Sequence, residues 1–142
     1  MKKIFVDTSF IISLFRKNDS NHNIAKKLSY LINENECYIS NGILIEIITI
    51  LMKRTKDLNL VETIYFYLQD NFNIINEYEL EDYADDVFSI FKKYNKDTFK
   101  VSFVDCSCVV ISKIFDIDYV LSFDKGFELF GEIMLFDVND VG

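Results

Sequence analysis

Four acidic residues are the first candidates for chemistry in this chain, because each one follows or interrupts an apolar segment. They are Asp7 at the end of KKIFVD, Glu46 within NGILIEIITILMKR, Asp105 near the start of VSFVDCSCVV, and Asp124 at the end of YVLSFD. An ionised carboxylate among apolar side chains loses roughly several kcal/mol of solvation unless it is paired or binds a metal. The sequence must therefore supply partners for these acids.

Cationic partners for the four acids are scarce. The chain has one His, and Arg occurs only as Arg16 and Arg54. A divalent cation meets the same need, and oxygen-only ligands favour Mg²⁺ or Mn²⁺ over zinc. Such an ion polarises a phosphoryl oxygen and lowers the pKa of a bound water, which suits hydrolysis of a phosphodiester. The four acids therefore predict a hydrolytic metal centre.

The elements that must position these acids alternate between strands and helices. Short apolar runs predict buried strands, and apolar residues at helical spacing predict the helices between them. We expect strands at 2–7, 37–40, 73–76, 119–124 and 133–137, and helices at about 9–16, 21–35, 41–54, 59–71, 80–94 and 102–115. This alternation implies a parallel sheet covered on both faces, so the predicted fold class is α/β.

The topology gives the acids a place to meet. In open parallel sheets the ligand site lies beyond the carboxyl ends of the strands, near the point where the strand order reverses. Asp7 and Asp124 each end a predicted strand, so they converge if those strands are neighbours. Asp105 lies in the first turn of a helix that enters from the same edge, and Glu46 lies about one turn into another.

Composition limits the class of protein. The 142 residues are half hydrophobic and include four Gly and no Pro, which predicts one domain over residues 1–142. No apolar run approaches the roughly 20 residues of a membrane span, and the N-terminus begins as a strand and not as a signal peptide. We therefore expect a cytoplasmic protein without a membrane partner. Its three cysteines lack metal-ligand spacing and are expected to be reduced and packed.

The net charge of −8 argues against nucleic-acid binding through the overall field. A bound metal and a few lysines can still offset the repulsion locally. Lys125, beside Asp124, is a candidate for substrate binding, and the hydroxyls of Thr8 and Ser9 are candidates for holding a substrate phosphate or a metal-bound water. The 14 Phe and eight Tyr leave apolar surface for a partner, so a dimer is expected.

The same segments resemble the PIN-domain ribonucleases, in particular the toxin halves of VapBC toxin–antitoxin pairs. FVDTSFIISLF resembles the opening strand and helix of that family with its first acid, and ISNGILIEIITIL resembles the segment with the second. VSFVDCSCVVISKIFDIDYVLSFDKGFELF resembles the closing signature, in which Asp105 and Asp124 take the third and fourth acidic positions and Phe127 the aromatic one. The resemblance covers nearly the whole chain. Each motif alone is short and only moderately specific for the family, whereas the order and spacing of the motifs together are strongly specific.

The resemblance implies a fold, an activity and partners. The fold is a PIN-like three-layer α/β/α sandwich around a parallel sheet of four to five strands. The activity is a Mg²⁺- or Mn²⁺-dependent endoribonuclease in which Asp7, Glu46, Asp105 and Asp124 bind the metal and catalyse hydrolysis of RNA. The implied partners are a second copy of the chain, in a homodimer, and a small antitoxin protein. Two departures, Cys106 where Ala is usual and Asp116 where Gly often ends the helix, do not touch the acids.

Each acid also has a purely structural interpretation. Asp7 can cap the helix that follows it, SFVD can form a capping box between Ser102 and Asp105, and DKG can make Asp124 part of a plain turn. Glu46 can face solvent on a narrow polar stripe or pair with Lys53 or Arg54. The acidic cluster from Glu77 to Asp86 is interpreted as a solvated helix face and the loop before it.

The functional alternatives belong to other classes of protein. The first alternative is a catalytically inactive PIN-fold module for protein interaction, in which the acids serve only structure. An aspartyl phosphatase is disfavoured because Ser9 occupies the position of the second acid that such enzymes use. Nucleotide-cofactor binding is disfavoured because no Gly-rich turn follows the first strand.

Overall fold

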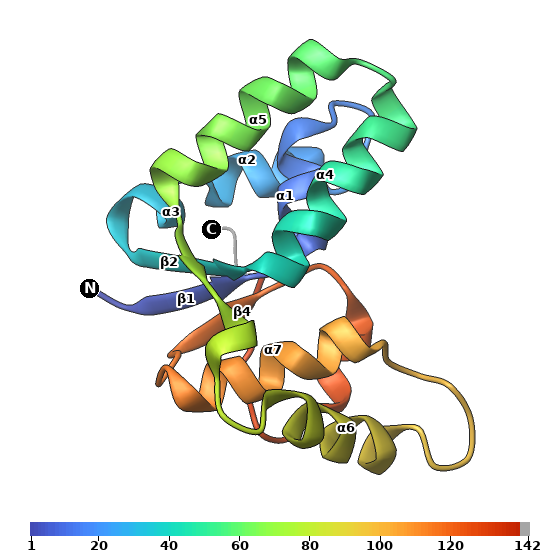
Figure 1. The fold of residues 1–142 in the computed structure, drawn as a ribbon. Coiled ribbons are helices and arrows are strands. Elements are labelled where there is room, and N and C mark those ends of the chain that lie inside the picture. Colours follow the sequence, from blue (N-terminus) through green and yellow to red (C-terminus); the bar gives the residue numbers. More distant parts are fainter. Residues whose placement is uncertain (140–142) are drawn as a thin grey trace.

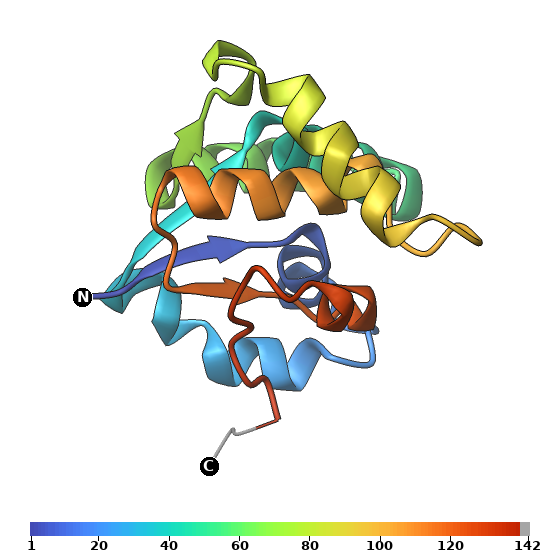
Figure 2. The same ribbon diagram turned by 90° about the horizontal axis from the view of Figure 1, so that it is seen from below.

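The computed structural model describes residues 1–139 and has a sheet of parallel strands between layers of helices. In chain order the elements are β1 (Lys3–Val6), α1 (Thr8–Phe15), α2 (His22–Leu28), α3 (Tyr30–Glu34), β2 (Glu36–Ser40), α4 (Asn41–Thr55), α5 (Leu58–Asn71), β3 (Asn73–Ile75), the 3₁₀ turn η1 (Glu77–Glu79), α6 (Tyr83–Tyr94), α7 (Phe103–Ile114), β4 (Tyr119–Leu121) and the 3₁₀ turn η2 (Lys125–Leu129). Helices α6 and α7 lie on one side of the sheet and α1, α2 and α3 on the other (Figures 1 and 2). The predicted three-layer α/β/α sandwich is confirmed.

The four strands are all parallel and run in the order β3-β2-β1-β4. The chain adds β2 and β3 on one side of β1 and then returns to add β4 on the other side. The strand order therefore reverses between β1 and β4, and this is where an α/β sheet opens a site. The backbone N–H of Asp7 donates to the carbonyl of Leu121 at 2.9 Å, so the pairing of these two strands extends to the first acid.

Local sequence explains where the elements begin and end. β1 carries a continuous apolar run, and Phe5 and Val6 within it have no exposed surface, as expected for a strand covered on both faces. α4 follows β2 without a loop, because the Ser40 hydroxyl accepts from the Ile43 N–H and caps the helix at once. The buried apolar residues form one core cluster around the sheet.

Two predicted elements differ from the structure. Residues 133–137 do not form a fifth strand, because β4 is only three residues long and Leu135 makes a single parallel bridge to Val120. The helix predicted for 21–35 is divided at Ser29, whose hydroxyl bonds to the Lys26 carbonyl and competes with the regular helical bond. Asp116, by contrast, has the left-handed φ of 53° that its place after α7 predicts.

All three cysteines are free and buried, as predicted. Across residues 1–139, every helix is too short or too polar to cross a membrane. The predicted single domain extends over 1–142, of which residues 140–142 lie outside the described part of the chain.

Candidate active site

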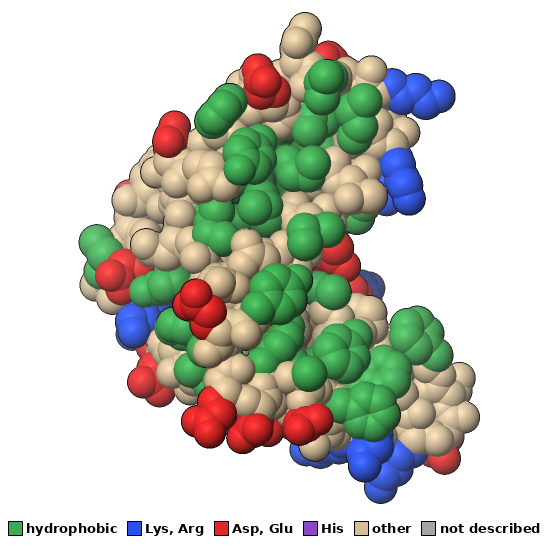
Figure 3. All heavy atoms as spheres, viewed as in Figure 1, with side chains coloured by type: hydrophobic (Ala, Val, Ile, Leu, Met, Phe, Trp, Pro, Cys, Tyr) green, Lys and Arg blue, Asp and Glu red, His purple; other side chains and the backbone are tan. Residues whose placement is uncertain are grey.

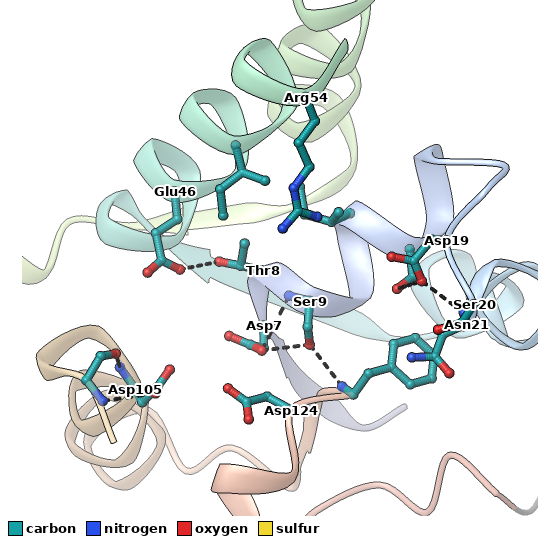
Figure 4. Close-up of a pocket in the computed structure, with 15 residues that line it drawn as sticks. Asp7, Thr8, Ser9, Asp19, Ser20, Asn21, Glu46, Arg54, Asp105 and Asp124 are labelled. Atoms are coloured by element: carbon teal, nitrogen blue, oxygen red, sulfur yellow. Dashed lines mark hydrogen bonds between the residues drawn. The ribbon is translucent and has the colours of Figure 1, made fainter. Parts of the chain in front are cut away.

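All four predicted acids line one open cavity of about 460 Å³ at the carboxyl-terminal edge of the sheet (Figure 4). Asp7 directly follows β1, and Asp124 lies three residues beyond β4. Glu46 comes from α4 and Asp105 from the first turn of α7. Four segments that are far apart in the sequence therefore bring their carboxylates to one place, as the topology predicted.

Asp7 is the most deeply buried of the four acids, with 4% of its surface exposed. Its Oδ2 atom accepts from the Ser9 N–H at 3.4 Å, from the Ser9 hydroxyl at 2.8 Å and from the Ser122 hydroxyl at 2.7 Å. Burial raises the pKa of the Asp7 carboxyl, and the bonds from Ser122 and Ser9 lower it only in part. Asp7 therefore caps α1 through one oxygen and leaves its other oxygen, Oδ1, without these bonds.

Ser9 and Thr8, which were predicted as contacts for substrate or for a metal-bound water, are held by the acids themselves. The Ser9 hydroxyl donates to Asp7 and also accepts from the Phe123 N–H at 2.9 Å, so it links the start of α1 to the segment after β4. The Thr8 hydroxyl donates to Glu46 Oε1 at 2.6 Å. Both side chains line the cavity and fix the position of a carboxylate.

Glu46 lies on the face of α4 that borders the cavity and is only partly buried. Burial raises the pKa of the Glu46 carboxyl; the Thr8 hydroxyl lowers it, and the nearby charges of Asp105 and Asp124 raise it further. The alternative of a salt bridge to Lys53 or Arg54 is wrong, since the one ion pair within residues 1–139 joins Lys93 to Glu132. Glu46 thus has a hydroxyl partner and no cationic one.

The sequence left open whether Asp105 and Asp124 serve local structure or lie at the site, and the structure shows that both residues do both. The Asp105 carboxylate accepts from the Ser102 N–H at 3.1 Å, and the Ser102 hydroxyl accepts from the Asp105 N–H at 3.0 Å, which completes the predicted capping box. Burial raises the pKa of Asp105, and the charges of Asp7 and Asp124 add to the rise. Asp124 Oδ1 accepts from the Gly126 N–H at 2.9 Å, so it also forms the predicted turn.

Two supporting residues were missed from the sequence. Ser122, which holds Asp7, lies between β4 and Asp124, and only the pairing of β4 with β1 brings it there. Glu77 was interpreted as part of a solvated cluster, but it is 1% exposed, so that interpretation is wrong. Its two carboxylate oxygens accept from the backbone N–H groups of Asn41 at 3.0 Å and Gly42 at 2.8 Å. Glu77 thereby holds the start of α4, the helix that carries Glu46.

The chemistry of the cavity fits a hard divalent cation. It offers carboxylate oxygens from five residues, the four predicted acids and Asp19, and within the described part of the chain none of these acids is paired with a Lys, Arg or His. In the same residues, no group of three Asp, Glu, His or Cys side chains is already close enough together to hold an ion. An ion here would therefore take few carboxylates and keep several waters, which is the usual coordination of Mg²⁺.

The cavity continues beyond the four acids toward the loop between α1 and α2. This end is lined by Asp19, Ser20 and Asn21 of the loop, and Arg54 of α4 also lines the cavity (Figure 4). Lys125, the predicted substrate contact, does not line this cavity. It lines a neighbouring cavity of about 350 Å³, which shares Asn21, Phe123 and Asp124 with the first.

The strand order and the position of the acids define the class of protein: an α/β fold with an acidic site where β1 meets β4. Residues 4–133 match the family model of the PIN domain. The chain belongs to the PIN-domain family. No curated protein matches its sequence.

Solved structures share the same fold. The toxin VapC20 of Mycobacterium tuberculosis, described as cleaving the sarcin-ricin loop, superposes with a TM-score of 0.73 at 24% identity, covering 92% of this chain and 98% of that one. VapBC2 of Rickettsia felis, bound to a DNA fragment from its promoter, gives 0.71 at 14% identity, covering 94% and 97%. PAE2754 of Pyrobaculum aerophilum gives 0.66 at 12% identity, covering 97% and 90%.

Proposed function

We propose that this protein is an endoribonuclease that depends on Mg²⁺ or Mn²⁺. The observation that supports it most is the convergence of Asp7, Glu46, Asp105 and Asp124 on one cavity without cationic partners among residues 1–139. Such an arrangement is electrostatically unfavourable by itself, because like charges repel and buried carboxylates lose solvation. A divalent cation, when bound, relieves this repulsion, polarises the phosphodiester and lowers the pKa of a water.

The residues of the chain have separate tasks in this proposal. Asp7, fixed by Ser9 and Ser122 through one oxygen, would offer its other oxygen to a bound ion. Glu46 is oriented by the Thr8 hydroxyl, and Asp105 by its capping box. Because these partners hold the carboxylates before substrate arrives, little reorganisation is needed during the reaction. The sequence left open which of the acids orients the attacking water.

Membership of the PIN-domain family supports RNA as the substrate, and the likeness to VapC20 supports a role as the toxin of a type II toxin–antitoxin pair. The likeness to VapBC2 supports a small antitoxin as partner. The neighbouring reading frame tests this part of the proposal. A short gene that adjoins this one and encodes a protein able to block RNA cleavage is expected, and its absence would favour a housekeeping nuclease.

An exposed apolar surface supports the proposed homodimer and the antitoxin. Figure 3 shows apolar side chains gathered over α4, α5, α6 and α7 on one face of the molecule. Exposed members of these helices are Ile45, Met52, Leu58, Tyr65, Phe66, Phe88, Phe103 and Ile114. A surface of this kind is typical of a protein interface. Light scattering on the purified chain should give the mass of a dimer, and cell fractionation should find the protein in the cytoplasm.

The activity is tested with purified protein, RNA and Mg²⁺ or Mn²⁺. Wild-type protein should cut the RNA and Asp7→Asn should not. The variant should stay folded, because all three hydrogen bonds to Asp7 end on one oxygen, which the amide oxygen of Asn can replace. Asp85→Asn is the matched control, since it removes the same charge from an exposed position on α6 and should leave cutting intact. Equal cutting by wild type and Asp7→Asn would refute the assignment.

The alternative proposal is a catalytically inactive PIN-fold module that serves protein interaction. The apolar surface over α4 to α7 favours it, because this surface does not depend on the acids. Isothermal titration with Mn²⁺ separates the two proposals. The nuclease should bind Mn²⁺ saturably and lose binding in Glu46→Gln, whereas the module should show no binding that depends on Glu46.

A further inference from the structure

Among residues 1–139, Arg54 is the one cationic residue that lines the acidic cavity. Glu46, Ile50 and Arg54 follow one another at intervals of four along α4, and all three border the cavity. Eight residues of helix span about 12 Å along the axis. Arg54 therefore leaves α4 about two turns beyond Glu46, and Figure 4 shows its side chain extending from the helix toward the cavity.

The guanidinium of Arg54 is not used to hold the fold together. Within residues 1–139 the single ion pair joins Lys93 to Glu132, so Arg54 pairs with neither Glu46 nor Asp19. Asp19, which also lines the cavity, accepts instead from the Ser13 hydroxyl and from the Asn21 N–H, each at 2.9 Å. The positive charge of Arg54 thus faces the cavity and is available to a ligand.

The chemistry of Arg54 favours a phosphate group as that ligand. Arg offers five N–H donors in a planar fork that matches two oxygens of a phosphate. A small free anion has little reason to enter, because five carboxylates line the same cavity and the chain has a net charge of −8. A polyanion that is held at the acidic end through a cation can place a second phosphate at Arg54.

We propose that Arg54 binds a phosphate of the RNA strand outside the bond that is cut, and so fixes the strand across the cavity. This inference rests on the proposed nuclease function. It assigns to Arg54 a binding role and no part in the bond breaking itself. Contacts to phosphates position a nucleic acid without reading its sequence, so the role of Arg54 should be the same for RNAs of different sequence.

The test measures binding of RNA that is not cut. Fluorescence anisotropy follows a labelled pool of mixed-sequence single strands of about 12 nucleotides, a length within the range that single-strand-binding domains cover. The protein is the full wild-type chain, with Ca²⁺ in place of Mg²⁺ so that a hard cation occupies the carboxylates while cutting is slowed, and the salt concentration is varied. Arg54→Ala should weaken binding about fivefold or more and reduce the slope of log affinity against log salt by about 0.7.

Lys53→Ala is the matched control, because Lys53 is the neighbouring exposed cation of α4 and does not line the cavity. Lys53→Ala should leave both the RNA affinity and the salt slope unchanged. Arg54→Lys should keep the salt slope, because the charge remains, and lose part of the RNA affinity, because the planar fork of N–H donors is lost. Circular dichroism checks that each variant is folded. Equal binding with and without Arg54→Ala, or the same loss in Lys53→Ala, would overturn the proposal.

Cleavage in the presence of Mg²⁺ separates this inference from the nuclease proposal. Arg54→Ala should raise KM for RNA and leave kcat close to its original value, because a contact kept in both ground and transition states changes binding alone. If the wild-type chain binds RNA through Arg54 but does not cut it, the nuclease proposal fails and the Arg54 site stands. If it cuts RNA and Arg54→Ala changes neither KM nor the salt slope, the Arg54 site fails alone.

Discussion

The carboxylate of Glu77 accepts a hydrogen bond of 2.8 Å from the backbone N–H of Gly42, at the first turn of α4. Its other oxygen accepts from the Asn41 N–H at 3.0 Å. The contact is close enough that a Cβ atom added at Gly42 would lie 3.2 Å from Glu77 Oε2. Two free N–H groups of the helix are thereby satisfied by a negative charge, which also suits the positive end of the helix dipole.

Removal of this carboxylate should destabilise the protein. Glu77→Ala should lower the free energy of unfolding by about 2–4 kcal/mol, because hydrogen bonds to a charged group are among the stronger ones and the two N–H groups would be left unsatisfied. Urea denaturation measures the change. Glu79→Gln, at an exposed neighbour, should stay within about 0.5 kcal/mol of wild type. A loss as small in Glu77→Ala as in the control would mean that water replaces the carboxylate without cost.

The Thr8 hydroxyl should tune the pH range of activity through Glu46. Thr8→Val keeps the shape of the side chain and removes the donor to Glu46 Oε1, so the pKa of Glu46, already raised by burial, should rise further. More Glu46 is then protonated at a given pH, and the acidic limb of the pH–rate profile should move to higher pH. The loss of metal affinity or activity should be about 10- to 100-fold, as for other residues that orient ligands.

Thr8→Ser is the matched variant for this prediction, since it keeps the hydroxyl and loses only a methyl group. It should restore the position of the acidic limb, whatever its effect on stability. An unchanged pH–rate profile in Thr8→Val would show that the 2.6 Å bond is not what orients Glu46.

Divalent cations should raise the melting temperature of the folded protein. A ligand that binds only the native state stabilises it by about 2.7 kcal/mol at a concentration 100 times its Kd. Differential scanning fluorimetry with Mn²⁺ should therefore show a clear increase for wild type and for Asp85→Asn. Asp7→Asn should show little or none, because it loses the most buried carboxylate of the cavity. An equal increase in Asp7→Asn would place the ion elsewhere.

Stability of the metal-free protein should fall as the pH rises. Burial raises the pKa of Asp7 above its ordinary value of 3.8, and it also raises the pKa of Glu46 above 4.5. The folded protein therefore holds these protons at a pH where the unfolded chain has released them. Their stabilising contribution is complete below the ordinary values and is lost as the pH rises through the higher values of the folded state.

Comparison with Asp7→Asn isolates this effect from the other carboxylates. The melting temperature of the variant relative to wild type should increase between about pH 4 and pH 7 in the presence of a chelator. Saturating Mn²⁺ should remove the difference in slope, because the ion replaces the protons. A difference that stays constant with pH would contradict the raised pKa of Asp7.

The parts of the fold that depend on local patterns were predictable. Asp7 and Asp124 follow apolar runs, and the Ser102–Asp105 capping box lies within four consecutive residues. The hydrophobic period and the residue spacing were therefore enough to predict these acids and the capping box. The segment 133–137 has a strand pattern as well, but a strand needs a neighbour of sufficient length, and β4 ends at Leu121.

The contacts that hold the acids were not predictable, because they join residues distant in sequence. Glu77 and Ser122 are indistinguishable from surface residues until β3 and β4 are placed in the sheet. Arg54 had one readable signal, its spacing of eight from Glu46, which puts both on one face of α4. That spacing did not reveal that the cavity extends from Glu46 to the loop around Asn21.

The adjacency of β1 and β4 has a consequence for the newly made chain. Strand β1 is synthesised long before β4, which is one of its two sheet neighbours, and the Asp7 N–H finds its acceptor only when Leu121 has been added. Contacts of such long sequence separation form slowly, because a long loop must be closed first. A growing polypeptide therefore carries Asp7, Glu46 and Asp105 before the edge of the sheet that brings them together is complete. Any truncation before Asp124 should lack the proposed site.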